Sequence, residues 1–278
     1  MSSSSPSSIP CSVLMLTRNN AVSLQACLQA LQDFSEIIVV DGHSTDGTRA
    51  IASQFMNVRL IDQPRDYLDA EGRILDFSAV RNAGLAFMTQ SWVLMVDTGE
   101  LLPEAFIAEV RQKVQSTPGV YYAHRIFFVD GVRIDRCSGY PARQIRLFHR
   151  SCTTGYVKAV HERLHLRPGT DVRTLVTPLP EIAPPRDVLR DKYAHYRELE
   201  YRRLGVLPWS RWVRHVLWRN LRSCAGLSLR LLGIWLFPGP GKRMPLVYEC
   251  AYMRQLVYLT VGLFPPIARR RMRLNGIR

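Results

Sequence analysis

The sequence predicts an α/β protein with a mostly parallel sheet covered by helices on both faces, followed by a basic helical appendage. Short apolar segments alternate with segments of helical periodicity up to about residue 114. The apolar segments lack polar alternation, which is typical of strands buried on both faces. The whole excess of positive charge falls in the last third of the chain, where the periodicity is helical.

The alternating part predicts four strands and four helices. The strands are expected at Ser12–Thr17, Glu36–Asp41, Val58–Ile61 and Trp92–Asp97. The helices are expected at Val22–Leu31, Thr48–Phe55, Asp76–Met88 and Pro103–Val114. In the first helix, apolar side chains recur at i, i+3, i+4 and i+7, which places them on one face. Asp76 is a favourable N-cap and Pro103 suits the first helical position, so they indicate where the later helices begin.

From Val120 the pattern changes to that of a mixed or antiparallel extension of the sheet. Strands are expected at Val120–Phe128 and Arg143–Phe148, and a short one at Val132–Ile134 is expected to pair back. Residues 178–185 contain four prolines and predict a linker.

Helices are expected again beyond the linker, at Val188–Leu204 and Trp209–Trp235. The predicted organisation is a disordered lead at residues 1–10, an α/β domain at 11–185 and a basic helical tail at 186–278.

Composition excludes several classes of protein. Of the 278 residues, 47% are hydrophobic and 22% are charged, which rules out a disordered or collagen-like chain. The six cysteines form no C-x-x-C pair, so we expect reduced structural thiols rather than a zinc site or disulfides. The start of the chain lacks the features of a secretory signal, and no run of about 18 apolar residues predicts a membrane span.

The positive charge is concentrated in the tail. Residues 1–185 contain 18 basic and 18 acidic side chains, whereas residues 186–278 contain 19 basic and 5 acidic ones, so the net charge of +14 belongs to the tail. Four of the five tryptophans lie there too. A basic, tryptophan-rich helix is typical of a membrane interface. A helix packed on the α/β domain with a solvated arginine face, and a nucleic-acid-binding segment, stay open as alternatives.

Two predicted strands end in an acid, Asp41 and Asp97. Open α/β sheets bind ligands outside the carboxyl ends of their strands, so the two acids indicate a polar ligand there. The segment from Asp41 to Thr48 supplies hydroxyls, backbone N–H groups and a helix start, which suit the base, ribose and phosphates of a nucleotide. The patterns G-x-x-x-x-G-K-[ST] and G-x-G-x-x-G are absent, which argues against a standard ATPase or dinucleotide enzyme.

Four motifs in order resemble a known family. LMLTRNN, EIIVVDGHSTDGT, SAVRNAGL and WVLMVDTGELLPE look like the nucleotide-sugar half of glycosyltransferase family 2, which implies the Rossmann-like GT-A fold. The following stretch, YPARQIRLFHRS with VHERL, resembles the subgroup that glycosylates the lipopolysaccharide core, often with glucose. The resemblance covers roughly residues 11–170.

The resemblance implies a donor-binding role for several residues. Asp41 matches the acid that holds the nucleobase, usually uracil, and Thr17 and Asn19 match the motif that lines the same pocket. Arg81 matches the arginine near the diphosphate, and Asp97 begins the D-x-D position that binds metal and diphosphate.

A divalent cation, Mg²⁺ or Mn²⁺, is implied by the same motif, but the chain departs from it. Gly99 stands in place of the second acid, and a single carboxylate is a poor site for either ion. Glu100 is adjacent and can substitute, or the diphosphate and waters can complete the shell. His161 is either a metal or phosphate contact or a structural orienter.

Glycosyl transfer also needs a base and a means of neutralising the leaving group. The acceptor hydroxyl loses a proton as it attacks, and Glu162 is the expected base. The leaving diphosphate must be neutralised by a metal or by basic side chains. Polar side chains alternate on one predicted strand face, at Gln144, Arg146 and Arg150. This pattern is consistent with binding of an anionic ligand or with a solvent-exposed strand face.

The expected function is an inverting glycosyltransferase that uses a UDP-sugar, preferably UDP-glucose, and a lipid-linked envelope glycan such as a lipopolysaccharide core. The expected place is the cytoplasmic face of a bacterial inner membrane, with the tail on the anionic surface and no nucleic-acid partner. Gly99 also motivates a glycosyltransferase-like binding or scaffold protein, and the basic tail motivates a nucleic-acid-binding protein.

Overall fold

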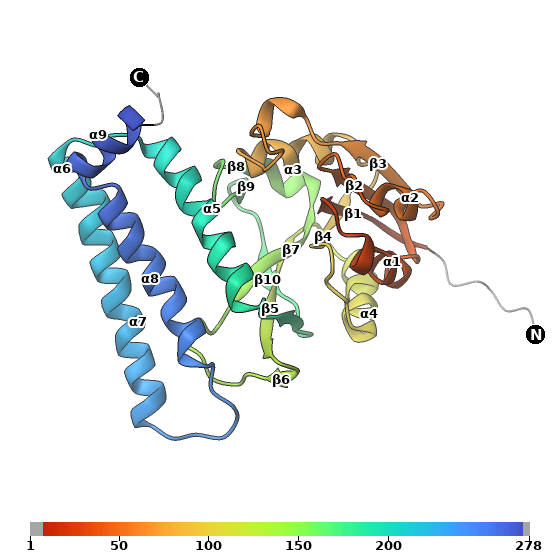
Figure 1. Ribbon diagram of the computed structural model, residues 1–278. Helices are drawn as coiled ribbons and strands as arrows, with labels where there is room; N and C mark the ends of the chain where they lie inside the picture. The colour runs from red at the N-terminus through yellow and green to blue at the C-terminus, as the bar shows by residue number, and fades with distance from the viewer. Residues whose placement is uncertain (1–7, 275–278) are drawn as a thin grey trace, which may run out of the picture. The chain divides into compact units, whose positions relative to one another are not determined.

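The structure is a computed structural model that describes residues 8–274, with side chains described through residue 270. The chain forms two compact units (Figure 1). The sheet unit contains residues 8–125 and 142–181, and the helical unit contains residues 126–141 and 182–274. The predicted boundary at 185 therefore falls near the start of the helical unit, but residues 126–141 also group with the helices. Residues 1–7 of the expected lead lie outside the described residues.

A mostly parallel sheet is built from the strands in the order β10-β5-β7-β4-β1-β2-β3. Strands β1, β2, β3 and β4 pair in parallel, whereas β7 pairs antiparallel with β4 and β5. Their bounds are β1 Ile9–Thr17, β2 Phe34–Asp41, β3 Val58–Asp62, β4 Trp92–Met95, β5 Val120–Val129, β7 Arg143–His149 and β10 Val172–Thr174. The predicted fold class, a mostly parallel sheet flanked by helices with a helical C-terminal region, is confirmed.

The helices of the sheet unit follow the predicted order. They are α1 Ala21–Ala30, α2 Thr48–Ala52, α3 Phe77–Ala86 and α4 Glu104–Lys113. Asp76 caps α3 as predicted, because its side chain accepts the Ala79 N–H at 2.9 Å. Helix α2 ends at Ala52 and is three residues shorter at its C-terminus than predicted.

Several boundaries differ from the sequence prediction. Strand β1 begins at Ile9, inside the expected lead, and β4 ends at Met95, which leaves Asp97 in a turn. The proline-rich segment predicted as a linker contains a strand, β11 Leu179–Ile182, paired with β5. Two further strands, β8 Thr153–Val157 and β9 Arg163–Leu166, form a separate antiparallel pair that the sequence did not predict.

The sheet is buried on both faces, as its apolar strands require. Along β1, Val13 and Met15 belong to one apolar cluster, together with α1 and α4. Leu14 belongs to a second cluster, which contains Val80 of α3. Alternate residues of one strand therefore pack against helices on opposite faces. All six cysteines are free.

The helical unit consists mainly of long helices. They are α5 Arg186–Leu204, α6 Trp209–Trp212, α7 Trp218–Leu236, α8 Leu246–Gly262 and α9 Pro265–Leu274. A π-helical turn, Val213–Leu217, joins α6 to α7, so the predicted long helix is present with a change of hydrogen-bonding pattern near its start. Within the described residues, no helix has the length and apolarity needed to span a membrane.

A buried carboxylate ties residues 126–141 to the helices of this unit. Glu249 of α8 accepts the Ser138 N–H at 2.9 Å and also the Ser138 hydroxyl. Strand β5 reaches this unit at its end, where Val129 pairs with Val132 of β6, Val132–Arg133, across the predicted hairpin. Burial of Glu249 requires these donors, and a sequence pattern cannot reveal such a pairing across more than a hundred residues.

Candidate active site

The carboxyl ends of three strands meet at one edge of the sheet. Thr17 of β1 is in register with Asp41 of β2, and Asp41 is in register with Asp62 of β3. Parallel pairing brings these strand ends together, so Thr17 and Asp41 lie side by side as the sequence predicted. Both side chains are buried, and Asp41 is fully inaccessible.

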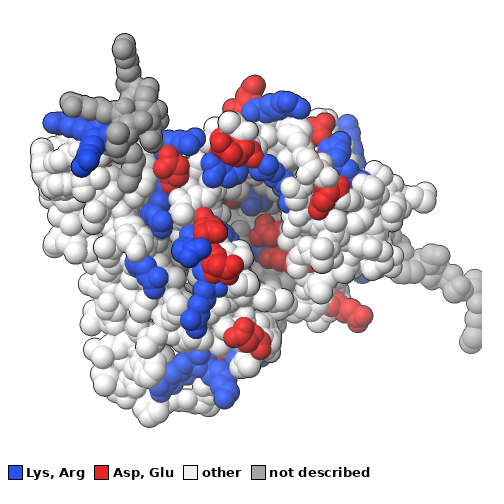
Figure 2. Space-filling model, viewed as in Figure 1, with Lys and Arg blue, Asp and Glu red and all other residues white. Residues whose placement is uncertain are grey.

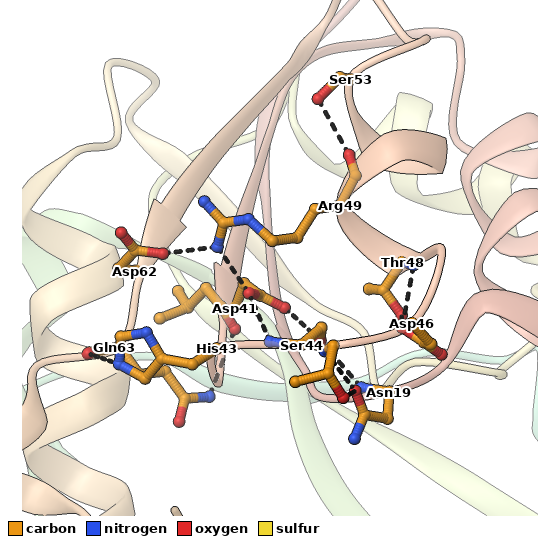
Figure 3. Close-up of polar contacts among 12 residues, drawn as sticks. Asn19, Asp41, His43, Ser44, Asp46, Thr48, Arg49, Ser53, Asp62 and Gln63 are labelled. Carbon is orange, nitrogen blue, oxygen red and sulfur yellow. Dashed lines mark hydrogen bonds and ion pairs between the residues drawn. The ribbon is translucent and has the colours of Figure 1, made fainter.

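Asp41 organises the loop that follows β2 (Figure 3). Its carboxylate accepts the Ser44 N–H at 3.0 Å and the Ser44 hydroxyl at 2.5 Å. The Arg49 guanidinium lies 2.7 Å from the same carboxylate. A carboxylate offers about four acceptor positions, so these bonds use most of its capacity.

Asn19 joins the loop after β1 to the loop after β2 (Figure 3). Its backbone N–H donates to Ser44 Oγ at 2.9 Å, and its side-chain oxygen accepts the Thr45 N–H at 2.8 Å. Asn19 has a φ of +52°, a conformation that asparagine adopts more readily than most residues. The structure therefore joins two of the predicted nucleobase residues, Asn19 and Asp41, through Ser44, and places the third, Thr17, beside Asp41 on the neighbouring strand.

Arg49 is a member of this network that sequence reasoning missed. It lies 2.7 Å from Asp41 and 2.5 Å from Asp62, and hydrogen bonds to these two acids raise its pKa. The Arg49 side chain is 42% exposed, so it lies at the surface beside the buried Asp41. The available signal was a basic residue in the first turn of a helix that starts directly after Asp46-Gly47.

A second charged cluster lies after β4. Asp97 and Glu100 face each other across a turn in which the Asp97 N–H donates to Glu100 Oε2 at 2.9 Å. Gly99 has a φ of +91°, a backbone conformation that favours glycine. The geometry of this turn therefore gives a physical reason for glycine where the family pattern has a second acid.

Arg81 joins this cluster to Glu162. Its Nε donates to Glu162 Oε1 at 2.9 Å, and its Nη2 lies 3.8 Å from Asp97 Oδ1. The guanidinium also lies over the Tyr156 ring, 5.6 Å from its centroid. Burial acts to lower the pKa of Arg81, but the net shift is upward because Tyr156, Asp97 and Glu162 outweigh it.

Arg146 is the second buried cation of the cluster and is 1% exposed. It forms an ion pair with Glu100, lies 3.4 Å from Asp97 Oδ2 and donates to the Met95 carbonyl at 3.3 Å. Burial raises the pKa of Glu100, although Arg146 acts in the opposite direction. Among the described atoms, Arg146 Nε is buried without a hydrogen-bond partner.

A cavity of about 330 Å³ opens beside this cluster. Glu162 is the single acid in its lining, whereas four arginines contribute to it. These are Arg81, Arg143, Arg146 and Arg163. The lining therefore favours an anionic ligand. Gln144 lies in the lining too, but Arg150 does not, because it donates to the Met88 carbonyl at 2.8 Å.

The predicted metal set was Asp97, Glu100 and His161. Within the described part of the chain, no three His, Cys, Asp or Glu side chains gather into a group that could hold a metal ion. Both Glu100 oxygens are engaged, one by Arg146 and the other by the Asp97 N–H. His161 is exposed and has a φ of +55°. The arrangement of donors therefore does not fit a protein-built divalent cation site.

The sheet and its strand-end site define a class: α/β proteins that bind a polar, anionic ligand at the carboxyl edge of a parallel sheet. Residues 12–164 match the family described as Glycosyl transferase family 2, and this match covers more than half of the chain. The chain belongs to glycosyltransferase family 2, as its motifs predicted.

Individual relatives match parts of the chain. A TPR repeat-containing protein of Synechococcus elongatus is 36% identical over 105 residues, which cover 37% of this chain and 24% of that protein. The SPbeta prophage-derived glycosyltransferase SunS of Bacillus subtilis is 27% identical over 161 residues, which cover 58% of this chain and 34% of that protein. The chain thus spans about a quarter to a third of the length of these relatives.

Solved structures show a distant likeness. Glucosyl-3-phosphoglycerate synthase from Mycobacterium tuberculosis, in complex with Mn²⁺, uridine diphosphate and phosphoglyceric acid, aligns with a TM-score of 0.46 and 15% identity. The alignment covers 70% of this chain and 77% of that chain.

Proposed function

We propose that this protein is an inverting glycosyltransferase that moves a sugar, with glucose favoured, from a UDP-sugar to a lipid-linked envelope glycan such as a lipopolysaccharide core. The observation that carries the proposal is that one carboxylate, Glu162, lines the same cavity as two buried arginines, Arg81 and Arg146, and is paired with Arg81. A base and two cations in one place meet both needs of glycosyl transfer.

The donor nucleotide is assigned to the network of Asn19, Asp41 and Arg49. Buried Asp41 accepts two hydrogen bonds from Ser44 and so fixes the conformation of the loop from Gly42 to Thr48 before a ligand binds. Membership of family 2 supports this assignment, because the matched region contains the whole loop.

The chemical step is a single displacement at the anomeric carbon. The oxygen of the acceptor hydroxyl forms a bond to that carbon, and the bond from the carbon to the diphosphate oxygen breaks with its electron pair. Glu162 takes the hydroxyl proton on Oε2, since Oε1 accepts from Arg81. One displacement of this kind inverts the configuration at the carbon.

Positive charge for the leaving diphosphate comes from Arg81 and Arg146. Arg146 is suited to this task because its buried Nε has no protein partner among the described residues. Guanidinium groups bind phosphate oxygens in a bidentate manner, and burial strengthens that attraction. The acids around Gly99 do not by themselves fit a divalent cation, so Mg²⁺ or Mn²⁺ would need the diphosphate and waters to complete its shell.

The lipid-linked acceptor and the membrane surface are supported by helix α7. Six exposed side chains, most of them large and apolar, recur along one stripe of this helix at spacings of three and four residues. They are Trp218, Leu221, Ala225, Leu229, Leu232 and Leu236. An exposed apolar stripe in a unit that carries the whole net charge suits an anionic membrane interface. We accordingly propose a peripheral protein at the cytoplasmic face of a bacterial inner membrane.

The test is release of free nucleotide by the purified protein. UDP-glucose, UDP-galactose, UDP-N-acetylglucosamine and GDP-mannose are incubated with it, with and without a lipopolysaccharide acceptor lacking its outer sugars. We expect release from UDP-glucose that depends on the acceptor. Nucleotide binding without release from any donor would favour the scaffold alternative that Gly99 motivates. Absence of both binding and release would overturn the proposal.

A further inference from the structure

The helical unit contains a groove of about 730 Å³ between α5 and α8. The two helices run in the same direction, as their hydrogen bonds show. Tyr248 Oη donates to the Pro184 carbonyl at 3.2 Å, and the Gln255 amide donates to the Tyr193 carbonyl at 3.1 Å. Both helices therefore begin at the same end of the groove, where their free N–H groups add positive potential.

One stripe of each helix lines the groove. Both stripes follow the spacing i, i+4, i+7 and i+11 that defines one helical face. On α5 they are Arg186, Arg190, Tyr193 and Arg197, and on α8 they are Val247, Ala251, Arg254 and Tyr258. The α5 stripe is mainly basic and the α8 stripe begins with two apolar side chains, so the groove offers cations and apolar surface together.

The charge of the groove is strongly positive. Four arginines line it against one acid, Asp187. Arg197 is engaged by the wall, since it donates to Gln255 at 2.6 Å and lies over the Tyr258 ring at 5.0 Å. Among the described residues, Arg186 and Arg254 have no hydrogen bond or ion pair with the protein. Two guanidinium groups are therefore free to bind an anion.

The remainder of the lining is apolar. Leu189, Val247 and Ala251 contribute aliphatic surface, and Tyr193 and Tyr248 contribute aromatic rings. A free inorganic anion would use the arginines and leave this surface in water. A ligand with a phosphate and an alkyl chain would use both, because binding would remove the apolar surface of its chain from water.

Figure 2 shows basic side chains gathered over the region of α5 and α8, with fewer acidic ones among them. We propose that the α5–α8 groove binds a phosphorylated lipid, with the phosphate between Arg186 and Arg254 and the chain along Leu189, Val247 and Ala251. The proposal deepens the proposed function. It rests on that function for one further statement, namely that the bound lipid carries the acceptor glycan.

The probe is octyl phosphate below its micelle-forming concentration, measured by isothermal titration calorimetry on the full-length protein. We expect R186Q/R254Q to raise its Kd by about tenfold or more, which corresponds to about 1.4 kcal/mol. The matched control is R269Q/R270Q, which removes two exposed charges from α9 of the same unit outside the groove. It should leave the Kd within about twofold, a difference of about 0.4 kcal/mol.

Further arms separate the ligand classes. Inorganic phosphate tests the arginines alone, and octyl glucoside tests the apolar wall alone; both should bind more weakly than octyl phosphate. A251F, which fills the groove without changing charge, should weaken octyl phosphate binding and leave UDP binding unchanged. Circular dichroism and UDP binding check that each variant is folded.

If the groove variant and the control weaken octyl phosphate binding equally, the groove is not the binding site, because the attraction is then general and electrostatic. If the protein binds inorganic phosphate as tightly as octyl phosphate, or prefers an RNA oligonucleotide, the ligand is not a phosphorylated lipid. The donor site is tested by UDP binding and nucleotide release, so a failure there leaves octyl phosphate binding intact and is distinguishable from failure of the groove.

Discussion

The guanidinium of Arg81 donates to the carboxylate of Glu162 across 2.9 Å, and 81 positions of sequence separate the two residues. This contact places the expected base beside a buried cation and near Asp97. It holds one carboxylate oxygen in a fixed direction and leaves the other, Oε2, for a ligand. The arrangement makes the role of Glu162 testable without disturbing the nucleotide loop.

Glu162→Gln should lower kcat by roughly 10²–10⁴-fold, because the amide cannot accept the hydroxyl proton. UDP affinity should change little, since the nucleobase network does not include this residue. Steady-state kinetics and calorimetry check both quantities, with Glu104→Gln as an exposed control on α4. A parallel loss of kcat and UDP affinity would make Glu162 a binding residue instead.

Arg146→Met should destabilise the protein by about 3–5 kcal/mol, because Glu100 would be left as a buried charge without its partner. Arg146→Met/Glu100→Gln should be less destabilised than the sum of the single changes, by about 0.5–3 kcal/mol. Urea unfolding measures all three variants. Arg202→Met, which breaks an exposed i, i+4 pair on α5, should cost only about 0.3–0.5 kcal/mol. Simple additivity in the cycle would contradict the proposed coupling.

Gly99→Asp restores the second acid of the family pattern but should destabilise the protein by about 1–3 kcal/mol, because residue 99 has a φ of +91°. Gly226→Ala is the control, since Gly226 lies within α7 with open space around its Cβ position and should gain about 0.5–1 kcal/mol. Thermal unfolding compares the two.

Titration with Mn²⁺ should show no binding to the natural protein without nucleotide. A tight site would contradict the poor fit of Asp97 and Glu100 to a cation described above.

The stability of the sheet unit should depend on Glu36 in acid. The Glu36 carboxylate accepts the Thr89 N–H at 2.5 Å, the Gln90 N–H at 3.2 Å and the Ser12 hydroxyl. Burial acts to raise its pKa, but hydrogen bonds from Ser12, Thr89 and Gln90 outweigh this and lower the pKa below 4.5. The folded state therefore gains stability above pH 4.5 and loses it as the pH falls through the lowered pKa.

Glu36→Gln tests this relation, because the amide cannot titrate. The variant should be less stable than the natural protein by about 1 kcal/mol at neutral pH, and the difference should shrink as the pH falls below 4.5. Urea unfolding at a series of pH values provides the measurement. A difference that stayed constant down to pH 3 would rule out titration of Glu36 as its source.

Replacing four arginines of α6, the π-helical turn and α7 with glutamine should weaken binding to anionic liposomes by roughly 1 kcal/mol for each charge near the surface. The residues are Arg211, Arg214, Arg219 and Arg222. The apolar stripe on α7 should leave a remainder that resists salt, because apolar insertion is not screened. Sedimentation with vesicles at low and high salt measures both parts. Unchanged binding at low salt by the folded variant would count against electrostatic anchoring.

Sequence alone predicted the class of fold and the part of the site that surrounds Asn19 and Asp41. The apolar runs before Thr17 and Asp41 could only be buried parallel strands, and parallel strands bring their carboxyl ends to one edge. Asn19, Asp41 and the loop between Gly42 and Thr48 were therefore predictable as neighbours, because the network depends on local turns beside paired strand ends. The family followed from the same motifs.

Only the tertiary structure decided which charges face one another around the cavity. Arg146 looked equivalent to Arg150 in the sequence, yet Arg146 is buried against Glu100 and Arg150 donates to the Met88 carbonyl after the end of β7. The pairing of Ser138 with Glu249 and the groove between α5 and α8 likewise join distant segments. Periodicity predicts which face of an element is apolar. The partner of a buried charge depends on how separate elements pack, so local sequence patterns do not predict it.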